Sequence, residues 1–181
     1  MDGVEGLERW AADARAREAA DARVRERWLR AQAEEEASLA GVLLALAERR
    51  ATVVASTVSG RRHRGVVTGV GMDFAVLETG AGTTTLVVLA AVADVRVVEG
   101  GPSSRPATGD GAACDLGVRL ADVLAQAAGP RPRISVQAGP ASVVGDLRAV
   151  GSDVLTLRTD APAVVYVGLA SVSEISFLAS G

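Results

Sequence analysis

The sequence predicts an α+β protein that is mainly β: a long N-terminal helix, then two five-stranded bent barrels, each preceded by its own helix. Three observations predict this fold class. Acids and arginines pair four positions apart in residues 1–37, the apolar period changes from 3.6 to 2 after residue 50, and the pattern of residues 38–98 returns later in the chain. With 181 residues, 49% hydrophobic and 3% aromatic, the chain can build cores from Val, Leu and Ala.

Residues 1–37 are predicted to form an extended charged helix. An acid precedes an arginine by four positions in pairs such as Glu5–Arg9 and Asp13–Arg17, which is the favourable order for a helical ion pair. The apolar positions are sparse and charges interrupt them, so the stripe is too thin for a coiled coil. We expect a solvated helix on which Trp10 and Trp28 are the candidate contacts for a partner.

Residues 38–98 are predicted to form the first repeat. Leu39, Val42, Leu43, Leu46 and Ala47 lie on one face of a helix that ends near Arg50. β-Branched residues and glycine-containing turns then predict five strands, at 52–58, 64–70, 74–79, 84–89 and 92–98.

Residues 99–114 are dense in Gly, Pro and Ser and are predicted to be a flexible linker. Residues 115–181 repeat the plan of the first repeat. A helix is expected over 115–129, with Leu116, Leu120, Val123, Leu124 and Ala127 on one face. Strands are expected at 133–138, 142–150, 154–159, 163–168 and 172–178.

The two repeats align with a constant shift of 80 positions, which indicates an internal duplication. The shift pairs Asp94 with Glu174, among many others. It also pairs the residues that we expect to shape the bends: Gly65 with Gly145, Gly71 with Gly151 and Asp73 with Asp153. Glycine permits a curved strand or a positive φ, and we expect the aspartate to cap its own backbone in the turn.

The stretches "RGVVTGVGMDFAVL" and "VGDLRAVGSDVLTL", with the closing "LAAVADVRV" and "LASVSEISF", resemble the motifs of the Sm-like fold of Sm, Lsm and Hfq proteins. The resemblance covers about 38–98 and 115–179. It implies small bent barrels that join strand four of one copy to strand five of the next, and RNA as a ligand.

The residues of the family's RNA pocket are missing, however. Gly71 and Gly151 stand where the family has an aspartate, and Ala75 and Leu155 stand where it has an asparagine. The second motif lacks the expected Arg-Gly pair in both copies. The RNA site of the family therefore does not carry over to these positions.

The segment "GRRHRG" is the strongest candidate contact with a protein partner or with RNA. Arg61, Arg62, His63 and Arg64 crowd the tip of a predicted hairpin. A purely structural explanation stays open, because a hairpin tip is polar in any case. All 19 basic residues are Arg, as expected for a bacterial genome of high GC content, and the second repeat has the uncharged "AGPASV" here.

No enzyme, cofactor or metal site is expected. His63 and Cys114 are single residues of their kinds, and no carboxylates accompany them at metal-ligand spacing. The segment "GAGTTT" lacks the end of a phosphate loop, and "TGVGMDF" lacks the third glycine of a dinucleotide motif. A net charge of -3 also argues against a dedicated nucleic-acid binder.

The sequence therefore predicts a cytoplasmic, non-enzymatic binding or scaffold protein. One cysteine suits a reducing compartment, and neither a signal peptide nor a membrane span is evident. Strands four and five are apolar with few charges, so their edges favour pairing, either between the two repeats of one chain or between chains. We favour internal pairing of the repeats, and we expect self-association through strand edges together with a protein partner. The alternative is an RNA-binding regulator that uses the Arg-rich tip.

Overall fold

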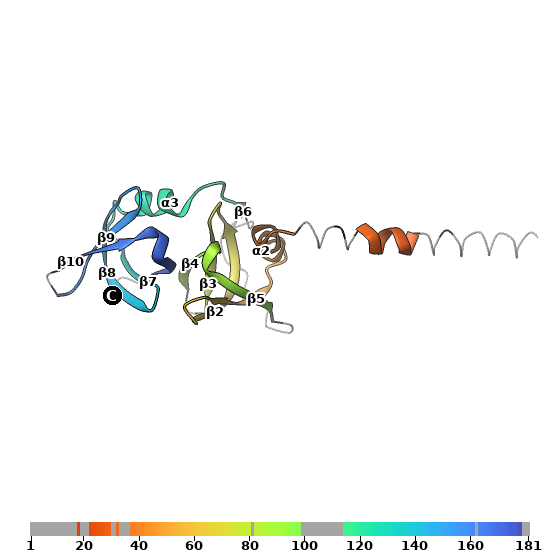
Figure 1. Ribbon diagram of the computed structural model, residues 1–181, viewed down its shortest axis with the longest axis horizontal. Coiled ribbons are helices and arrows are strands. Elements are labelled where there is room, and N and C mark those ends of the chain that lie inside the picture. Colours follow the sequence, from red (N-terminus) through yellow and green to blue (C-terminus); the bar gives the residue numbers. More distant parts are fainter. Residues whose placement is uncertain are drawn as a thin grey trace, which may run out of the picture. The chain divides into compact units, whose positions relative to one another are not determined.

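The computed structural model describes residues 18, 22–29, 32, 37–80, 82–98, 114–161 and 163–178. The chain divides into two compact units, Met1–Ser38 and Leu39–Gly181. In the first unit, residues 18, 22–29 and 32 are helical. The second unit holds the strands (Figure 1).

The second unit repeats one order of elements. Its helices are α2 (Leu39–Glu48) and α3 (Leu120–Ala127), with 3-10 turns η1 (Leu89–Ala91) and η2 (Leu169–Ser171). Its strands are β1 (Thr52–Thr57), β2 (Arg62–Val70), β3 (Phe74–Thr79), β4 (Thr83–Val88), β5 (Val92–Val97), β6 (Cys114–Asp115), β7 (Arg133–Ala138), β8 (Ala141–Val150), β9 (Val154–Arg158), β10 (Val164–Gly168) and β11 (Val172–Phe177). Each expected strand overlaps an observed one, because alternating apolar residues are a local signal.

The strands form one open sheet. Antiparallel neighbours follow the order β10-β9-β8-β7-β11-β4-β3-β2-β1-β5, and the short β6 runs parallel to β2. Strand β11 of the second repeat pairs with β4 of the first repeat through Glu174↔Val87, Ile175↔Leu86 and Ser176↔Thr85. Strands β5 and β10 lie at the two ends of the sheet.

The predicted fold class is wrong in two respects. The ten antiparallel strands form one continuous open sheet rather than two bent barrels, because the free edge of β4 is filled by β11 of the other repeat. The described helices are also short: α2 has 10 residues and α3 has 8, and no long N-terminal helix precedes the sheet in the described part of the chain. The predicted linker, 99–114, lies outside the described residues except for Cys114.

The second helix begins later than predicted. Residues Cys114 and Asp115 form β6 beside β2, and Leu116 donates its backbone N–H to the Val70 carbonyl at 2.8 Å. Gly117 then takes a positive φ of 57°, and α3 starts at Leu120. The segment before α3 is therefore bound to the first repeat instead of being helical.

The same local irregularities occur in both repeats at the 80-residue shift. Strand β2 has a register shift between Val67 and Gly69, and β8 has one between Leu147 and Ala149. After the bend, the N–H of Gly71 donates to Phe74 O at 2.8 Å, and that of Gly151 donates to Val154 O at 2.8 Å. That these repeats derive from an Sm-like domain stays a prediction.

Two of the expected bend residues have a steric reason to be glycine. A Cβ at Gly145 would lie 2.6 Å from the Arg158 carbonyl oxygen, and a Cβ at Gly65 would collide with the Glu78 carbonyl oxygen. Real side chains cannot approach backbone this closely. The glycines therefore allow the neighbouring strand to pass close by, in addition to any curvature.

Two apolar clusters form the core, and one of them crosses between the repeats. The first consists of first-repeat residues: Leu43, Leu46, Ala47, Val53, Ala55, Val67, Val70, Ala75, Leu77 and Val87. The second consists of second-repeat residues together with Phe74 and Leu86 of the first repeat. The junction of β4 and β11 is thus part of a core. Among the described residues, no helix is both long and apolar enough to cross a lipid bilayer.

Candidate functional site

The Arg-rich tip is divided between the two faces of strand β2. Side chains alternate along a strand, so Arg62 and Arg64 lie on one face and His63 on the other. Arg62 and Arg64 are exposed, whereas the His63 side chain is only 10% exposed. The structure therefore does not bring the four predicted contact residues together as one surface.

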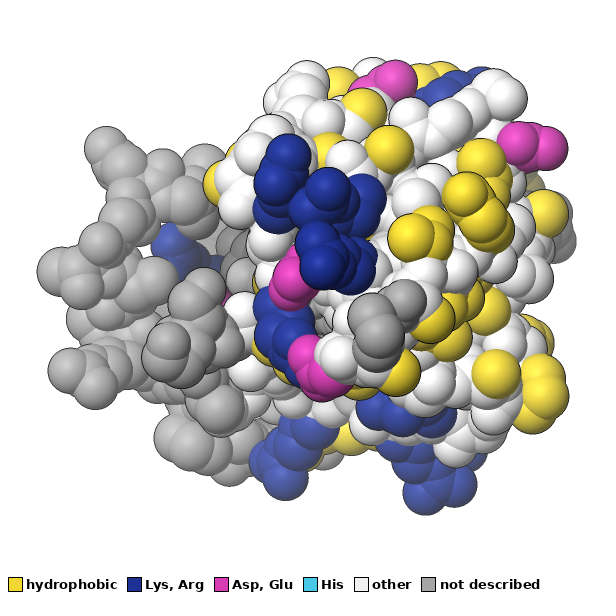
Figure 2. Space-filling view, turned by 90° about the vertical axis from the view of Figure 1, so that its left-hand side faces the viewer, with side chains coloured by type: hydrophobic (Ala, Val, Ile, Leu, Met, Phe, Trp, Pro, Cys, Tyr) yellow, Lys and Arg dark blue, Asp and Glu magenta, His cyan; other side chains and the backbone are white. Residues whose placement is uncertain are grey.

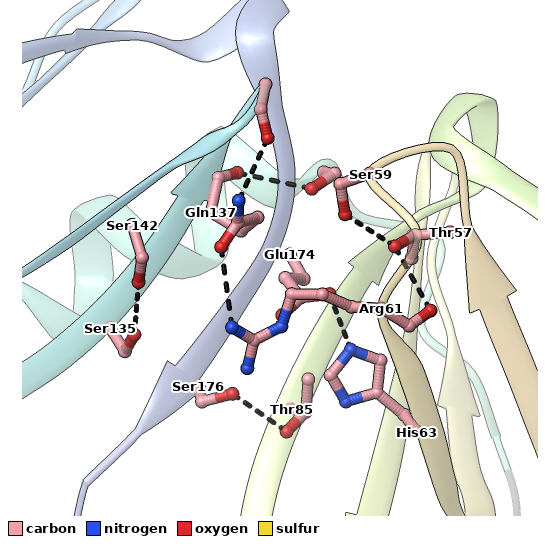
Figure 3. A network of polar contacts seen from close by, with 12 residues as sticks. Thr57, Ser59, Arg61, His63, Thr85, Ser135, Gln137, Ser142, Glu174 and Ser176 are labelled. Atoms are coloured by element: carbon pink, nitrogen blue, oxygen red, sulfur yellow. Dashed lines mark hydrogen bonds and ion pairs between the residues drawn. The ribbon is translucent and has the colours of Figure 1, made fainter.

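The inward residues of the tip bind a carboxylate from the other repeat. Glu174 on β11 is 3% exposed; Arg61 Nε lies 2.7 Å from its Oε1, and His63 Nε2 lies 2.5 Å from its Oε2. Figure 3 shows both side chains pointing toward Glu174. We call Arg61, His63 and Glu174 the junction triad. It joins residues that are 111 positions apart in the chain.

Further polar contacts surround the junction triad. Arg61 Nη1 donates to Gln137 Oε1 at 3.5 Å, and Gln137 Nε2 donates to the Gly139 carbonyl at 2.9 Å. On the adjoining strands, the hydroxyls of Thr85 and Ser176 lie 3.0 Å apart (Figure 3). The β4–β11 junction therefore carries polar side chains on one face.

The alternation of β11 explains how an acid reaches this position. Glu174 pairs with Val87, a fully buried residue of the first core, so its side chain faces the first repeat. The next residue, Ile175, is also fully buried and pairs with Leu86 in the second core. Strand β11 thus places Ile175 in the second core and Glu174 on the same face of the sheet as Val87.

Because Glu174 is buried, the junction triad is stable only when the carboxylate keeps its partners. A buried carboxylate is unfavourable unless it is paired and hydrogen-bonded, and removing one partner of a buried pair typically costs roughly 3–5 kcal/mol. Glu174 has two partners, one on each oxygen. Arg61 is half exposed, so its share of that energy is reduced by solvent.

Apolar and capping contacts complete the junction. Phe74 is fully buried and Leu86 is 3% exposed in the core of the second repeat. Asp73 Oδ1 accepts a hydrogen bond of 2.8 Å from the backbone N–H of Leu120, the first residue of α3. The prediction that Asp73 caps its own turn is therefore incomplete, because its carboxylate caps a helix of the other repeat.

The two ends of the sheet correspond to the two strands that meet at the junction. At the 80-residue shift, β10 is the counterpart of β4, and β5 is the counterpart of β11. Strand β10 leaves Val164 and Tyr166 exposed, at 55% and 72%. Strand β5 carries an ion pair between Arg96 Nε and Asp94 Oδ1 of 3.0 Å.

The outer face of the second repeat mixes charges of both signs. Arg133, Asp146 and Arg158 are neighbours across β7, β8 and β9. Arg133 also donates to both oxygens of Asp160, at 2.8 and 2.5 Å. Figure 2, which views the molecule from the β8–β10 side of Figure 1, shows basic and acidic side chains intermixed beside hydrophobic ones. This face is not a uniform basic patch.

The remaining predicted contacts lie in the N-terminal unit. Trp10 lies outside the described residues. Trp28 is helical and 64% exposed, and Val24, one turn earlier, is 55% exposed. In the described part of the chain, no group of three or more His, Cys, Asp or Glu side chains is placed to hold a metal ion.

Sequence reasoning missed Glu174 and Gln137. The available signal was a single acid in the otherwise apolar or small strand "VSEISFL", together with the only histidine of the chain. No protein-family model matches the chain, and no curated protein matches it.

Proposed function

We propose that the protein is a cytoplasmic, non-enzymatic binding or scaffold protein that self-associates through the two ends of its sheet. The observation that carries the proposal is the β4–β11 junction inside the chain. The same kind of antiparallel strand pairing could form between β10 of one chain and β5 of another. The Sm-like resemblance implies the same joint of strand four with strand five.

An unpaired edge strand favours this association. Strand β10 pairs only with β9, and β5 pairs only with β1, among the described strands. Such edges present unpaired backbone N–H and C=O groups to any strand that can add to the sheet. Because the two edges differ, the contact would be head-to-tail, which yields closed rings or open chains.

The exposed side chains of β10 support the same proposal. Tyr166 is the counterpart of Leu86 at the 80-residue shift, and each occupies the same register position beside the preceding strand. Leu86 is 3% exposed at the junction, whereas Tyr166 is 72% exposed. Docking of β5 from a second copy would cover Tyr166 as β11 covers Leu86.

The exposed arginines of β2 are the proposed contact with a partner protein. Arg64, Val54 and Arg96 are neighbours across β2, β1 and β5, and Arg62 lies two residues before Arg64 on the same face. This surface suits an acidic protein. RNA is less favoured, because Arg61 and His63 are engaged by Glu174 and the tip retains only Arg62 and Arg64 for phosphate.

Light scattering after gel filtration tests the self-association. We expect a mass above that of one chain, which falls toward the monomer in Tyr166→Lys, because a lysine on the edge opposes strand pairing. Val58→Lys is the matched control, since Val58 is equally exposed, at 71%, but lies in the β1–β2 turn. A wild-type monomer at several hundred micromolar would overturn the proposal.

The same samples distinguish the partner class. We expect the protein purified from its own cells to carry no nuclease-sensitive absorbance at 260 nm. A nuclease-sensitive complex that is lost in Arg62→Glu/Arg64→Glu would instead favour the RNA alternative, and that binding would weaken steeply with salt.

A further inference from the structure

The junction triad has no equivalent at the ends of the sheet. At the 80-residue shift, Arg61 corresponds to Ala141 and His63 corresponds to Val143, so the second repeat has neither the cation nor the ring N–H. On the strand that docks, Glu174 corresponds to Asp94 and Ser176 corresponds to Arg96. The two joints therefore differ in charge although their backbones correspond.

We propose that the junction triad selects which strand docks on which edge: β4 accepts β11, and β10 accepts β5. This inference rests on the proposed self-association for its biological use. Its separate claim is that charge complementarity decides which strand pairs with which edge. Strand β11 brings a single acid to a repeat that offers Arg61 and His63. Strand β5 brings Asp94 and Arg96, which already neutralise each other, to a repeat that offers no charge at these positions.

The first mismatched joint, β5 on β4, is disfavoured by like charge. In the place of Ser176, Arg96 would lie on the same strand face as the acid and beside Thr85, which is 2% exposed. It would bring a second guanidinium to the face that already holds Arg61. Asp94 is one methylene shorter than Glu174, so it is less able to reach both Arg61 and His63.

The second mismatched joint, β11 on β10, is disfavoured by an unpaired acid. Glu174 would then face Ala141 and Val143 instead of Arg61 and His63. A carboxylate buried without a cation or a donor is strongly unfavourable. Both mismatched pairings are therefore disfavoured. The choice of strand depends on these unfavourable charge interactions as well as on the favourable contacts of the matched pairings.

Transplanting the triad to the free ends tests the inference. The full graft, Asp94→Glu/Arg96→Ser/Ala141→Arg/Val143→His, gives β5 the acid of β11 and gives the second repeat the partners of that acid. The half grafts are Asp94→Glu/Arg96→Ser alone and Ala141→Arg/Val143→His alone. Asp94 and Arg96 are 41% and 74% exposed, and Ala141 is exposed, so the changes at these three positions spare the core, whereas Val143 packs against it.

Sedimentation equilibrium of the full-length variants gives the readout. We expect the dissociation constant for self-association to fall at least tenfold in the full graft, and to rise or stay unchanged in each half graft. Denaturant unfolding of each variant checks that the fold is kept, since Val143 is partly buried. If Val143→His unfolds the chain, Ala141→Arg with Asp94→Glu/Arg96→Ser is the second variant, with a smaller expected gain.

The outcomes separate the two proposals. A monomeric wild type with an associating full graft would support the triad as a selector and overturn the proposed function. An associating wild type whose full graft binds no more tightly than the half grafts would overturn the selector alone. A folded full graft that stays monomeric would also overturn it.

Discussion

Arg133 and Asp160 form the best-defined ion pair on the outer face of the sheet. Two hydrogen bonds from Arg133, and then its charge, hold the pKa of Asp160 below the usual carboxyl value. Because the pKa is lowered on folding, the pair stabilises the folded protein above the pKa of the unfolded carboxyl. That contribution is lost as the pH falls through the lowered pKa.

Removing the arginine should therefore raise the pKa of Asp160 toward its ordinary value. We expect this for Arg133→Gln in an NMR titration of the side-chain carboxyl, with little change in the unfolding midpoint, because exposed pairs contribute little. Arg158→Gln is the control, since Arg158 lies on the same outer row as Arg133, on the other side of Asp146. An unchanged Asp160 pKa in Arg133→Gln would contradict the assignment.

Single residues also mark the limit of prediction from sequence. The recurrence of Gly65 as Gly145 indicated a constrained bend, but the close approach of β3 and β9 depends on strand pairing that no local pattern specifies. Glu174 was harder still. Its burial results from which strand docks on β4, so its partners could not be inferred from neighbours in the sequence.

At the scale of elements, α3 depends on the first repeat for its start. A helix of 8 residues is too short to be stable by itself in water. The Asp73 carboxylate satisfies the N–H of Leu120, and Met72 N–H donates to the Val118 carbonyl at 2.9 Å. The bend between β2 and β3 therefore supplies one cap of α3, in addition to the Asp122 carboxylate, which accepts from the Arg119 N–H at 3.4 Å.

Loss of this cap should destabilise the fold by about 1 kcal/mol, as for other helix caps. We expect this for Asp73→Ala as a lower midpoint of denaturant unfolding, with partial recovery in Asp73→Asn. Asp153→Ala is the matched control, because Asp153 holds the same position in the second repeat and is exposed. Equal losses in Asp73→Ala and Asp153→Ala would show that the bend, rather than the cap, is what matters.

The positions of the strands were more predictable from the sequence than the contacts between elements. Period-2 alternation and glycine turns are local, and they placed all ten long strands. The start of α3 was misplaced because Cys114 and Asp115 pair with β2, which is a tertiary contact. Local pattern therefore identified the strands, and long-range contact decided where the second helix begins.

At the scale of the whole molecule, the error in fold class concerns closure into barrels rather than the strands. The favoured pairing of strand four with strand five of the other repeat is the one that β4 and β11 form, and it joins the ten antiparallel strands into one open sheet. At this pairing, Glu174 is bound by Arg61 and His63, and Leu86 lies opposite Ile175. These residues are distant in sequence, so composition and periodicity do not reveal the contacts between them.

A shared junction predicts cooperative unfolding of residues Leu39–Gly181. Phe74 belongs to β3 of the first repeat, yet it is fully buried in the core of the second. Replacing a buried Phe by Ala typically costs roughly 3–5 kcal/mol. We expect Phe74→Ala to lower the stability of both repeats together, because the sheet and the second core cross from one repeat to the other.

Hydrogen exchange with mass spectrometry across a denaturant series would measure this repeat by repeat. Peptides from β1–β3 and from β7–β9 should lose protection at the same denaturant concentration in the wild type, and both should shift equally in Phe74→Ala. Leu77→Ala, in the first core alone, should also shift both, since a break in either core removes the surface on which β4 and β11 pair. If Leu77→Ala shifts only the first repeat, the junction is a contact between two independent folding units rather than part of one.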